Sequence, residues 1–242
     1  MTNIVVLVPI YKSEMNRMES YSLDVSLSAL KKREIHFIGS AKLDKRLYTA
    51  RYPSIPFIGW DDSSFASVQG YSRLLLNTDF YNRFIDYEFM LILQTDAIVL
   101  RDELDYWCMQ PFDYVGAPWP NGVELFVNIG RLEGDKGKRV IATVGNGGFS
   151  LRRIKKFISI LSEFPDALNL FKRTGSSEDL FFSLMGTLSS DFIVPNEITA
   201  SRFSMELKPS YYYSVNGGIL PMGSHAWSKY EPEFWKQHLK GI

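Results

Sequence analysis

Phe89–Leu100, which reads FMLILQTDAIVL, is an apolar run interrupted in its middle by the polar triplet Gln94-Thr95-Asp96. A run this short and this apolar, without alternation, is typical of a strand covered on both faces at the centre of a mostly parallel sheet. Open α/β sheets bind ligands at the carboxyl ends of such strands. A carboxylate there is costly to bury unless a cation or a hydrogen-bond donor meets it, so Asp96 predicts a ligand site that holds a metal ion.

The first forty residues predict half of a nucleotide-binding α/β unit. Ile4–Val8 is a β-branched run that ends at Pro9, as expected of a buried strand that stops at the ligand edge of a sheet. A helix capped by Ser13 and a second strand over Ile35–Gly39 follow it. We therefore expect an α/β fold with a Rossmann-like, mostly parallel central sheet that is flanked by helices.

The remaining pattern adds elements around this sheet. Further strands are predicted for residues 55–60, 140–144 and 149–151, and helices for residues 67–84, for residues 152–164 with their charges in solvent, and from Glu178 onward. Residues 121–138 contain several Gly and mixed charges, which predicts a small antiparallel excursion from the sheet.

Composition limits the classes of function. The 242 residues suit a single domain, 1–242, and a formal net charge of +0 argues against nucleic acid as a partner. The lone Cys108 fits a reducing cytoplasm, and we expect no signal peptide and no transmembrane segment. Aromatic residues and lysines alternate from Trp227 to Lys240, which allows either peripheral contact with the inner face of a membrane or a helix that packs back on the domain.

Four motifs in a fixed order resemble those of glycosyltransferases of the GT-A fold. Gln94-Thr95-Asp96 resembles the Asp-x-Asp motif, with Gln94 in place of the first Asp. Asn146–Ser150 resembles the glycine-containing acceptor loop, Ser177-Glu178-Asp179 the x-Glu-Asp motif, and Gly223-Ser224-His225 the carboxy-terminal metal-binding His. The chain is thus similar to this family over most of its length, and to small uncharacterised bacterial glycosyltransferase-like proteins associated with surface polysaccharides.

The resemblance implies transfer of a sugar from a nucleotide diphosphate, most often UDP, to a hydroxyl of a glycan or lipid-linked acceptor. Asp96 and His225 would be the ligands of Mn²⁺ or Mg²⁺ at the leaving diphosphate, and Gln94 would bond to ribose or sugar. Asp179, or next Glu178, would be the general base of an inverting displacement.

Other residues are candidates for the donor and acceptor, and several of them have a structural alternative. For the donor they are Pro9, Tyr11, Lys12, Thr95, Asp61 at the ribose and Arg73 at the phosphates; for the acceptor they are Trp119, Asn146, Gly147 and Gly148. Asp61 can instead make a turn and cap a helix, Arg73 can be a surface residue, and Gly147-Gly148 can be a plain turn. Ser176 and Asp179 also fit a capping box, and His225 can be a hydrogen-bonded structural residue.

Two functions of other classes stay open at this point. A nucleotidyltransferase would also use an α/β sheet and a metal-binding Asp, although no glycine-rich phosphate signature lies near the first strand. A non-catalytic sugar-binding or nucleotide-binding domain is favoured by Gln94 and by the abundance of aromatic residues. Release of pyrophosphate would identify the first, and binding without turnover the second.

Overall fold

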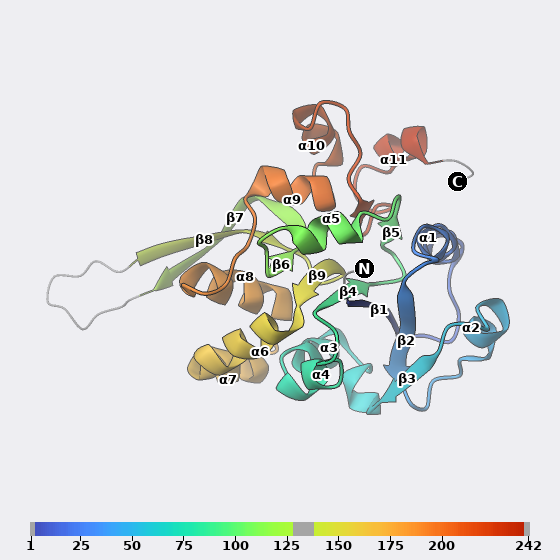
Figure 1. Cartoon of the computed structure of the whole chain (residues 1–242), viewed down its shortest axis with the longest axis horizontal. Coiled ribbons are helices and arrows are strands. Elements are labelled where there is room, and N and C mark those ends of the chain that lie inside the picture. The colour runs from blue at the N-terminus through green and yellow to red at the C-terminus, as the bar shows by residue number, and fades with distance from the viewer. Residues whose placement is uncertain (1–2, 128–137, 240–242) are drawn as a thin grey trace, which may run out of the picture.

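The computed structural model describes residues 3–127 and 138–239, and a six-stranded sheet forms its centre (Figure 1). The strand order is β3-β2-β1-β4-β9-β6, with the first four strands parallel and β9 antiparallel to both of its neighbours. The expected α/β fold with a mostly parallel sheet is confirmed. The strands are β1 (Ile4–Ile10), β2 (Glu34–Ser40), β3 (Phe57–Trp60), β4 (Phe89–Leu93), β6 (Tyr114–Val115) and β9 (Phe149–Arg153).

Helices cover both faces of the sheet, which explains why β1 and β4 are apolar without alternation. Val5 and Leu7 of β1 pack on one side in a cluster with α3 (Val68–Leu75), α4 (Thr78–Asn82), α6 (Ile154–Glu163) and α8 (Glu178–Leu188). Val6 and Val8 pack on the other side with α1 (Arg17–Ala29), α2 (Arg46–Arg51), α5 (Leu104–Met109) and α9 (Glu197–Phe203). α7 (Pro165–Thr174) lies against α6 and α8.

The central strand is shorter than the sequence predicts. β4 ends at Leu93, the chain turns at Gln94–Asp96, and a two-residue strand β5 (Ile98–Val99) follows. The turn is fixed by hydrogen bonds from the Gln94 backbone N–H to the Gly148 carbonyl, 2.8 Å, and from the Ala97 N–H to the Gln94 carbonyl, 2.9 Å. The prediction of one strand to Leu100 was wrong because β5 leaves this sheet and pairs antiparallel with β10 (Gly223–Ser224).

The antiparallel excursion is a ribbon of two strands, β7 (Ala117–Val127) and β8 (Lys138–Gly145), that projects from the body of the molecule (Figure 1). Residues 128–137 of the predicted excursion lie outside the described residues. The strand predicted for residues 140–144 is confirmed as part of β8. The base of the ribbon places Trp119 and the glycine loop beside the carboxyl edge of β4.

Several helix boundaries differ from the predictions for local reasons. Asn16, not Ser13, caps α1 in a capping box with Glu19. The helix predicted for residues 67–84 is divided because the Asn77 side chain caps a second helix, accepting from the Asp79 N–H. α6 begins at Ile154, so Arg152 belongs to β9 and is fully buried rather than exposed.

The carboxy-terminal segment packs on α1. α10 (Pro209–Val215) and α11 (Pro232–His238) contribute Tyr212 and Trp235 to a core cluster that includes Trp227. Trp227 and Trp235 are at most 1% exposed, so the structure has the helix that packs back on the domain. No helix within the described residues is long and apolar enough to cross a membrane. A short 3₁₀ helix, η1 (Asp62–Ser64), follows β3.

Candidate active site

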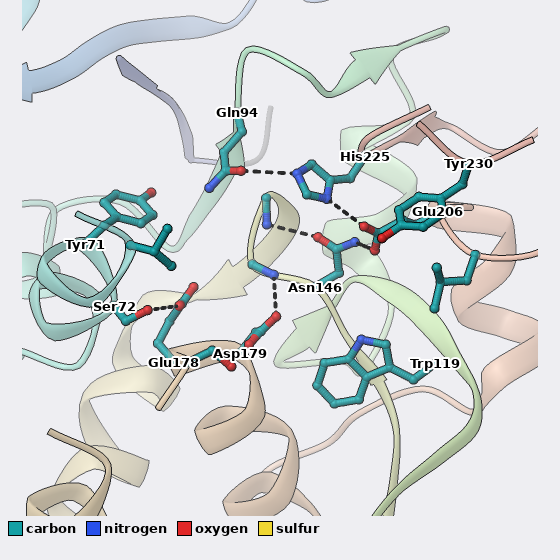
Figure 2. A pocket seen from close by; sticks show the side chains of 15 residues that line it. Tyr71, Ser72, Gln94, Trp119, Asn146, Glu178, Asp179, Glu206, His225 and Tyr230 are labelled. Carbon is teal, nitrogen blue, oxygen red and sulfur yellow. Dashed lines mark hydrogen bonds and ion pairs between the residues drawn. The ribbon is translucent and has the colours of Figure 1, made fainter. Parts of the chain in front are cut away.

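A cavity of about 360 Å³ lies at the carboxyl edge of β4, where the sequence predicted a ligand site. Gln94 and His225 lie on one side of it and Glu178 and Asp179 on another (Figure 2). It thus brings together residues from all four motifs. Its lining consists of Val68, Tyr71, Ser72, Gln94, Trp119, Asn146, Gly147, Gly148, Ser177, Glu178, Asp179, Glu206, Leu207, His225 and Tyr230.

His225 joins three polar side chains at the edge of this cavity. Its Nε2 lies 3.2 Å from Asp96 Oδ1 and 3.1 Å from Gln94 Oε1, and its Nδ1 lies 3.2 Å from Glu206 Oε1. Burial lowers the pKa of His225, but the hydrogen bonds and charges of Asp96 and Glu206 outweigh burial and raise that pKa to about 10. Burial raises the pKa of Asp96, and His225 reverses this effect and lowers that pKa below its ordinary value.

The glycine loop between β8 and β9 permits close approach of two site residues. A Cβ on Gly148 would lie 2.3 Å from His225 Nε2, and a Cβ on Gly147 would lie 2.2 Å from Glu178 Oε1. Asn146 has φ of 75°, and its Oδ1 accepts from the Gly148 N–H at 3.0 Å. Only glycine at both positions lets His225 and Glu178 pack on this backbone, so the loop is more than a plain turn.

The first turn of α8 presents two carboxylates of different environment. Asp179 is half-buried; its Oδ1 accepts from the Leu180 N–H at 2.8 Å and its Oδ2 from the Gly147 N–H at 3.3 Å. Glu178 is buried. The predicted capping box does not form, because the N-cap is Ser177 and its side chain makes no capping bond. Asp179 therefore links the helix start to the glycine loop and faces the cavity.

A buried ion pair lies behind Glu178. Glu178 Oε1 is 3.3 Å from Arg152 Nη2, and Glu178 Oε2 accepts from Ser72 Oγ at 3.1 Å. Arg152 also donates to Tyr81 Oη at 3.1 Å and to the Gly147 carbonyl at 3.4 Å. Burial and the charge of Asp179 raise the pKa of Glu178, against the opposing effect of Arg152. The pair holds Glu178 in place, which leaves Asp179 as the accessible carboxylate of the two.

A second cavity of about 420 Å³ adjoins the first and is lined mainly by apolar and aromatic side chains. The two cavities share Val68, Tyr71 and Gln94. Tyr11 and Phe65 complete the aromatic wall, with ring centroids 5.7 Å apart, and Tyr11 Oη accepts from Gln94 Nε2 at 3.2 Å. Such a wall offers a stacking surface for a planar ligand.

Other predicted donor residues do not line either cavity. Asp61 is exposed and caps η1 by accepting from the Ser63 N–H, which is the turn that the sequence offered as its alternative. Arg73 donates to the Lys172 carbonyl at 3.3 Å on the surface of α3. Lys12 is exposed and pairs with Glu19 at 2.8 Å. Pro9 is buried within β1, and Thr95 is buried in the turn after β4.

Asp96 and His225 are the residues here that could hold a divalent cation. They supply a carboxylate and an imidazole, and the amide oxygen of Gln94 points to the same ring nitrogen. Hard divalent cations and Mn²⁺ accept such oxygen and imidazole ligands. No cluster of three or more His, Cys, Asp or Glu suited to a metal occurs within residues 3–127 and 138–239, so most of the coordination shell would come from water or substrate.

Sequence reasoning missed Glu206, Ser72 and Tyr230, which line the cavity. Glu206 contacts both His225 and Asn146. It lies in a short connection between α9 and α10, without a motif or a periodic pattern around it. A single Glu in such a segment gives no signal until the fold places it beside His225.

Comparison with known proteins gives a family and a fold. A family model described as "Protein of unknown function (DUF5672)" matches residues 54–225, and no curated protein matches the chain. Among solved structures, the galactosyltransferase LgtC in complex with donor and acceptor sugar analogs is similar with a TM-score of 0.56 and 16% identity, over 98% of this chain and 97% of that one.

Two other glycosyltransferase structures are similar with slightly lower TM-scores. Mouse xyloside xylosyltransferase 1 in its apo form has a TM-score of 0.53 and 11% identity, over 93% of this chain and 97% of that one. The bifunctional glycosyltransferase WbbM has a TM-score of 0.53 and 9% identity, over 96% of this chain and 47% of that one. At these identities the likeness establishes a glycosyltransferase fold.

Proposed function

Because the chain belongs to the DUF5672 family and has a glycosyltransferase fold, we propose that it transfers a sugar from a nucleotide diphosphate to a hydroxyl of a glycan acceptor. One observation carries the proposal. Gln94, His225 and Asp179 line a single cavity at the carboxyl edge of β4, with Asp96 in contact with His225. A diphosphate and an acceptor hydroxyl would find a cation site and a carboxylate there, which are the two requirements of the reaction.

The aromatic cavity is the proposed place of the nucleobase. Tyr11, Phe65 and Tyr71 form a wall on which a planar base can stack. Since this cavity shares Gln94 with the first, a nucleotide bound there would direct its diphosphate toward Asp96 and His225. UDP is the nucleotide we propose first, because it is the commonest in the family that the motifs resemble.

Asp96 and His225 are the proposed ligands of Mn²⁺ or Mg²⁺. When bound, the cation would neutralise charge on the leaving diphosphate. Glu206 supports this assignment because a metal-binding His generally gives its other ring N–H to a carboxylate, and Glu206 Oε1 lies 3.2 Å from Nδ1. Asn146 holds Glu206 from its other side by donating to Oε2.

Replacing Glu206 by Gln is expected to weaken Mn²⁺ binding by about tenfold or more, since loss of such a carboxylate partner typically costs 10–100-fold in metal affinity. The measurement is titration of Mn²⁺ followed by the electron paramagnetic resonance signal of the free ion, which needs no turnover. Glu233→Gln is the matched control, because Glu233 is exposed on α11 and bonds to Lys236. Equal affinity in all three proteins would remove Glu206 from this role.

Asp179 is the proposed base. The acceptor oxygen would attack the anomeric carbon as its proton passes to Asp179, the bond from that carbon to the diphosphate oxygen would break, and the nucleoside diphosphate would leave. Asp179 lies in the first turn of α8, where the helix dipole interacts favourably with negative charge. An attack of this kind inverts the anomeric configuration, so a product of retained configuration would exclude Asp179 as the base while leaving the donor site.

Calorimetric titration of UDP, GDP and CDP, with and without Mn²⁺, tests the donor site. We expect one nucleotide to bind only in the presence of Mn²⁺, and Asp96→Ala to weaken that binding by about tenfold or more because the cation loses its carboxylate. Asp86→Ala is the control, because Asp86 is an exposed carboxylate in the turn before β4, outside both cavities.

The outcomes separate the possible functions. Absence of binding by every nucleotide would contradict the proposal. With the matching nucleotide sugar, release of a nucleoside diphosphate supports sugar transfer, whereas release of pyrophosphate would identify a nucleotidyltransferase. A lipid-linked acceptor, a cytoplasmic site of action at the inner face of a membrane and a part in surface-polysaccharide synthesis stay predictions.

A further inference from the structure

A third cavity, of about 650 Å³, lies beside the proposed active site. Three chain segments line both cavities, each giving one residue to the first and the next residue to the other. Because consecutive Cα atoms are about 3.8 Å apart, the two cavities share a wall. The pairs are Trp119 with Pro120, Leu207 with Lys208, and Tyr230 with Glu231, and Figure 2 shows Trp119 and Tyr230 on the same side of the first cavity.

The backbone of this third cavity is held in costly conformations. Asn121, Lys208 and Glu231 line it with φ of 73°, 51° and 46°. Together with Asn146 in the first cavity, they are four of the five non-glycine residues with positive φ among the described parts of the chain. Each such residue costs about 1–3 kcal/mol, and such positions gather where a site depends on their geometry.

The lining offers hydrogen bonds and one aromatic surface. Tyr211 is 53% exposed, and Glu197, whose Oε1 accepts from Tyr212 Oη, lines the same cavity. The side chains of Lys208 and Glu231 line this cavity and make no hydrogen bond or ion pair with another of the described residues. Two carboxylates and one ammonium group disfavour an anionic ligand such as a phosphate. Hydroxyl groups and the flat face of a sugar ring fit this lining.

We propose that the third cavity binds the inner sugars of an oligosaccharide acceptor, while the terminal sugar occupies the first cavity beside Asp179. This proposal rests on the proposed function and narrows its acceptor to a chain of two or more sugars. Trp119, Leu207 and Tyr230 form the wall over which such a chain passes from one cavity to the other. Tyr211 and Glu231 are then specificity-determining residues that contact substrate outside the reacting centre.

The test is binding of the whole protein to an array of oligosaccharides of known structure, with and without nucleotide. Each hit is then titrated beside its terminal monosaccharide. We expect an oligosaccharide to bind at least about tenfold more tightly than its terminal sugar. Tyr211→Ala should lower the affinity for the oligosaccharide about tenfold and leave the affinity for the terminal sugar unchanged. Glu231→Gln acts in the same direction without loss of packing. Tyr106→Ala is the matched control, because Tyr106 is also 53% exposed and lies on α5, away from these cavities.

Two results would overturn the proposal. The first is that no oligosaccharide binds more tightly than its terminal sugar. The second is that both Tyr211→Ala and Glu231→Gln bind the oligosaccharide with the affinity of the parent protein. Nucleotide binding is measured on the same protein. If the protein binds nucleotide but gives either of these results, the oligosaccharide proposal fails and the proposed transfer reaction stands. If the protein prefers oligosaccharides but binds no nucleotide, the proposed transfer reaction fails instead.

Discussion

Asp179→Asn is expected to lower kcat for sugar transfer by about 10²–10⁴-fold, the usual contribution of a positioned general base. Asp179 now accepts from the Gly147 N–H at 3.3 Å and from the Leu180 N–H at 2.8 Å. The single Oδ1 of asparagine can keep one of these two hydrogen bonds, so the substitution removes the base and one hydrogen bond. Nucleotide binding is expected to stay unchanged, because Asp179 lies across the cavity from Gln94 and His225 (Figure 2). Initial rates with the nucleotide sugar and acceptor, beside calorimetry of the nucleotide, separate these effects.

Asp166→Asn is the matched control for this substitution. Asp166 also lies in the first turn of a helix, α7, but it is exposed and outside the cavity. It is expected to retain the parent rate. If Asp179→Asn also retained that rate, Asp179 would not be the base, and the reaction would need a different proton acceptor.

Arg152→Met is expected to lower the free energy of unfolding by about 3–5 kcal/mol, the usual effect of removing one partner of a buried ion pair. Glu178 is 5% exposed and would lose the cation that holds it at 3.3 Å. Arg152 also packs on aromatic rings, with its guanidinium 5.3 Å from the Phe157 ring. Urea denaturation measures the change.

Arg139→Met is the control for this loss of an ion pair. Arg139 pairs with Glu124 across the β7–β8 ribbon, and both side chains are more than half exposed, so its removal should cost at most about 1 kcal/mol. The double variant Arg152→Met with Glu178→Gln should recover part of the loss, because no uncompensated charge then remains buried. An Arg152→Met protein as stable as the parent would show that the ion pair is not a structural support.

The free energy of unfolding of Arg152→Met should depend on pH because of Glu178. Burial already raises the pKa of Glu178 above its ordinary value, and loss of Arg152 removes the effect that opposes burial. A carboxyl group whose pKa is higher in the folded state than in the unfolded state destabilises the fold as the pH rises from the unfolded-state pKa to the folded-state pKa. The loss of stability should therefore be smaller at acid pH than at neutral pH.

Local patterns in the sequence were sufficient for much of the fold. The apolar runs that form β1 and β4 predict strands covered on both faces, because each residue in such a strand meets a helix layer. The start of α8 at Glu178 was also predicted. The predictions failed at boundaries where a distant segment decides the outcome: β4 ends at Leu93 because the next residue bonds to Gly148, and Arg152 is buried because β9 lies between β4 and β6.

The candidate site divides in the same way. Its motifs could be chosen from sequence because Gln94, Asp96, Gly148, Asp179 and His225 lie in recognisable segments. Glu206, Tyr230 and the third cavity could not be chosen, since their surroundings come from segments far apart in the chain.

The sequence by itself thus determined the fold class and the motif residues, because hydrophobic runs, glycines and helix starts act over a few neighbouring positions. Only the tertiary structure decided which of these side chains meet. His225 contacts Gln94, which is 131 residues away, and Arg152 pairs with Glu178, which is 26 residues away. Such contacts depend on strand order and on helix packing, which bring together groups that no local pattern connects.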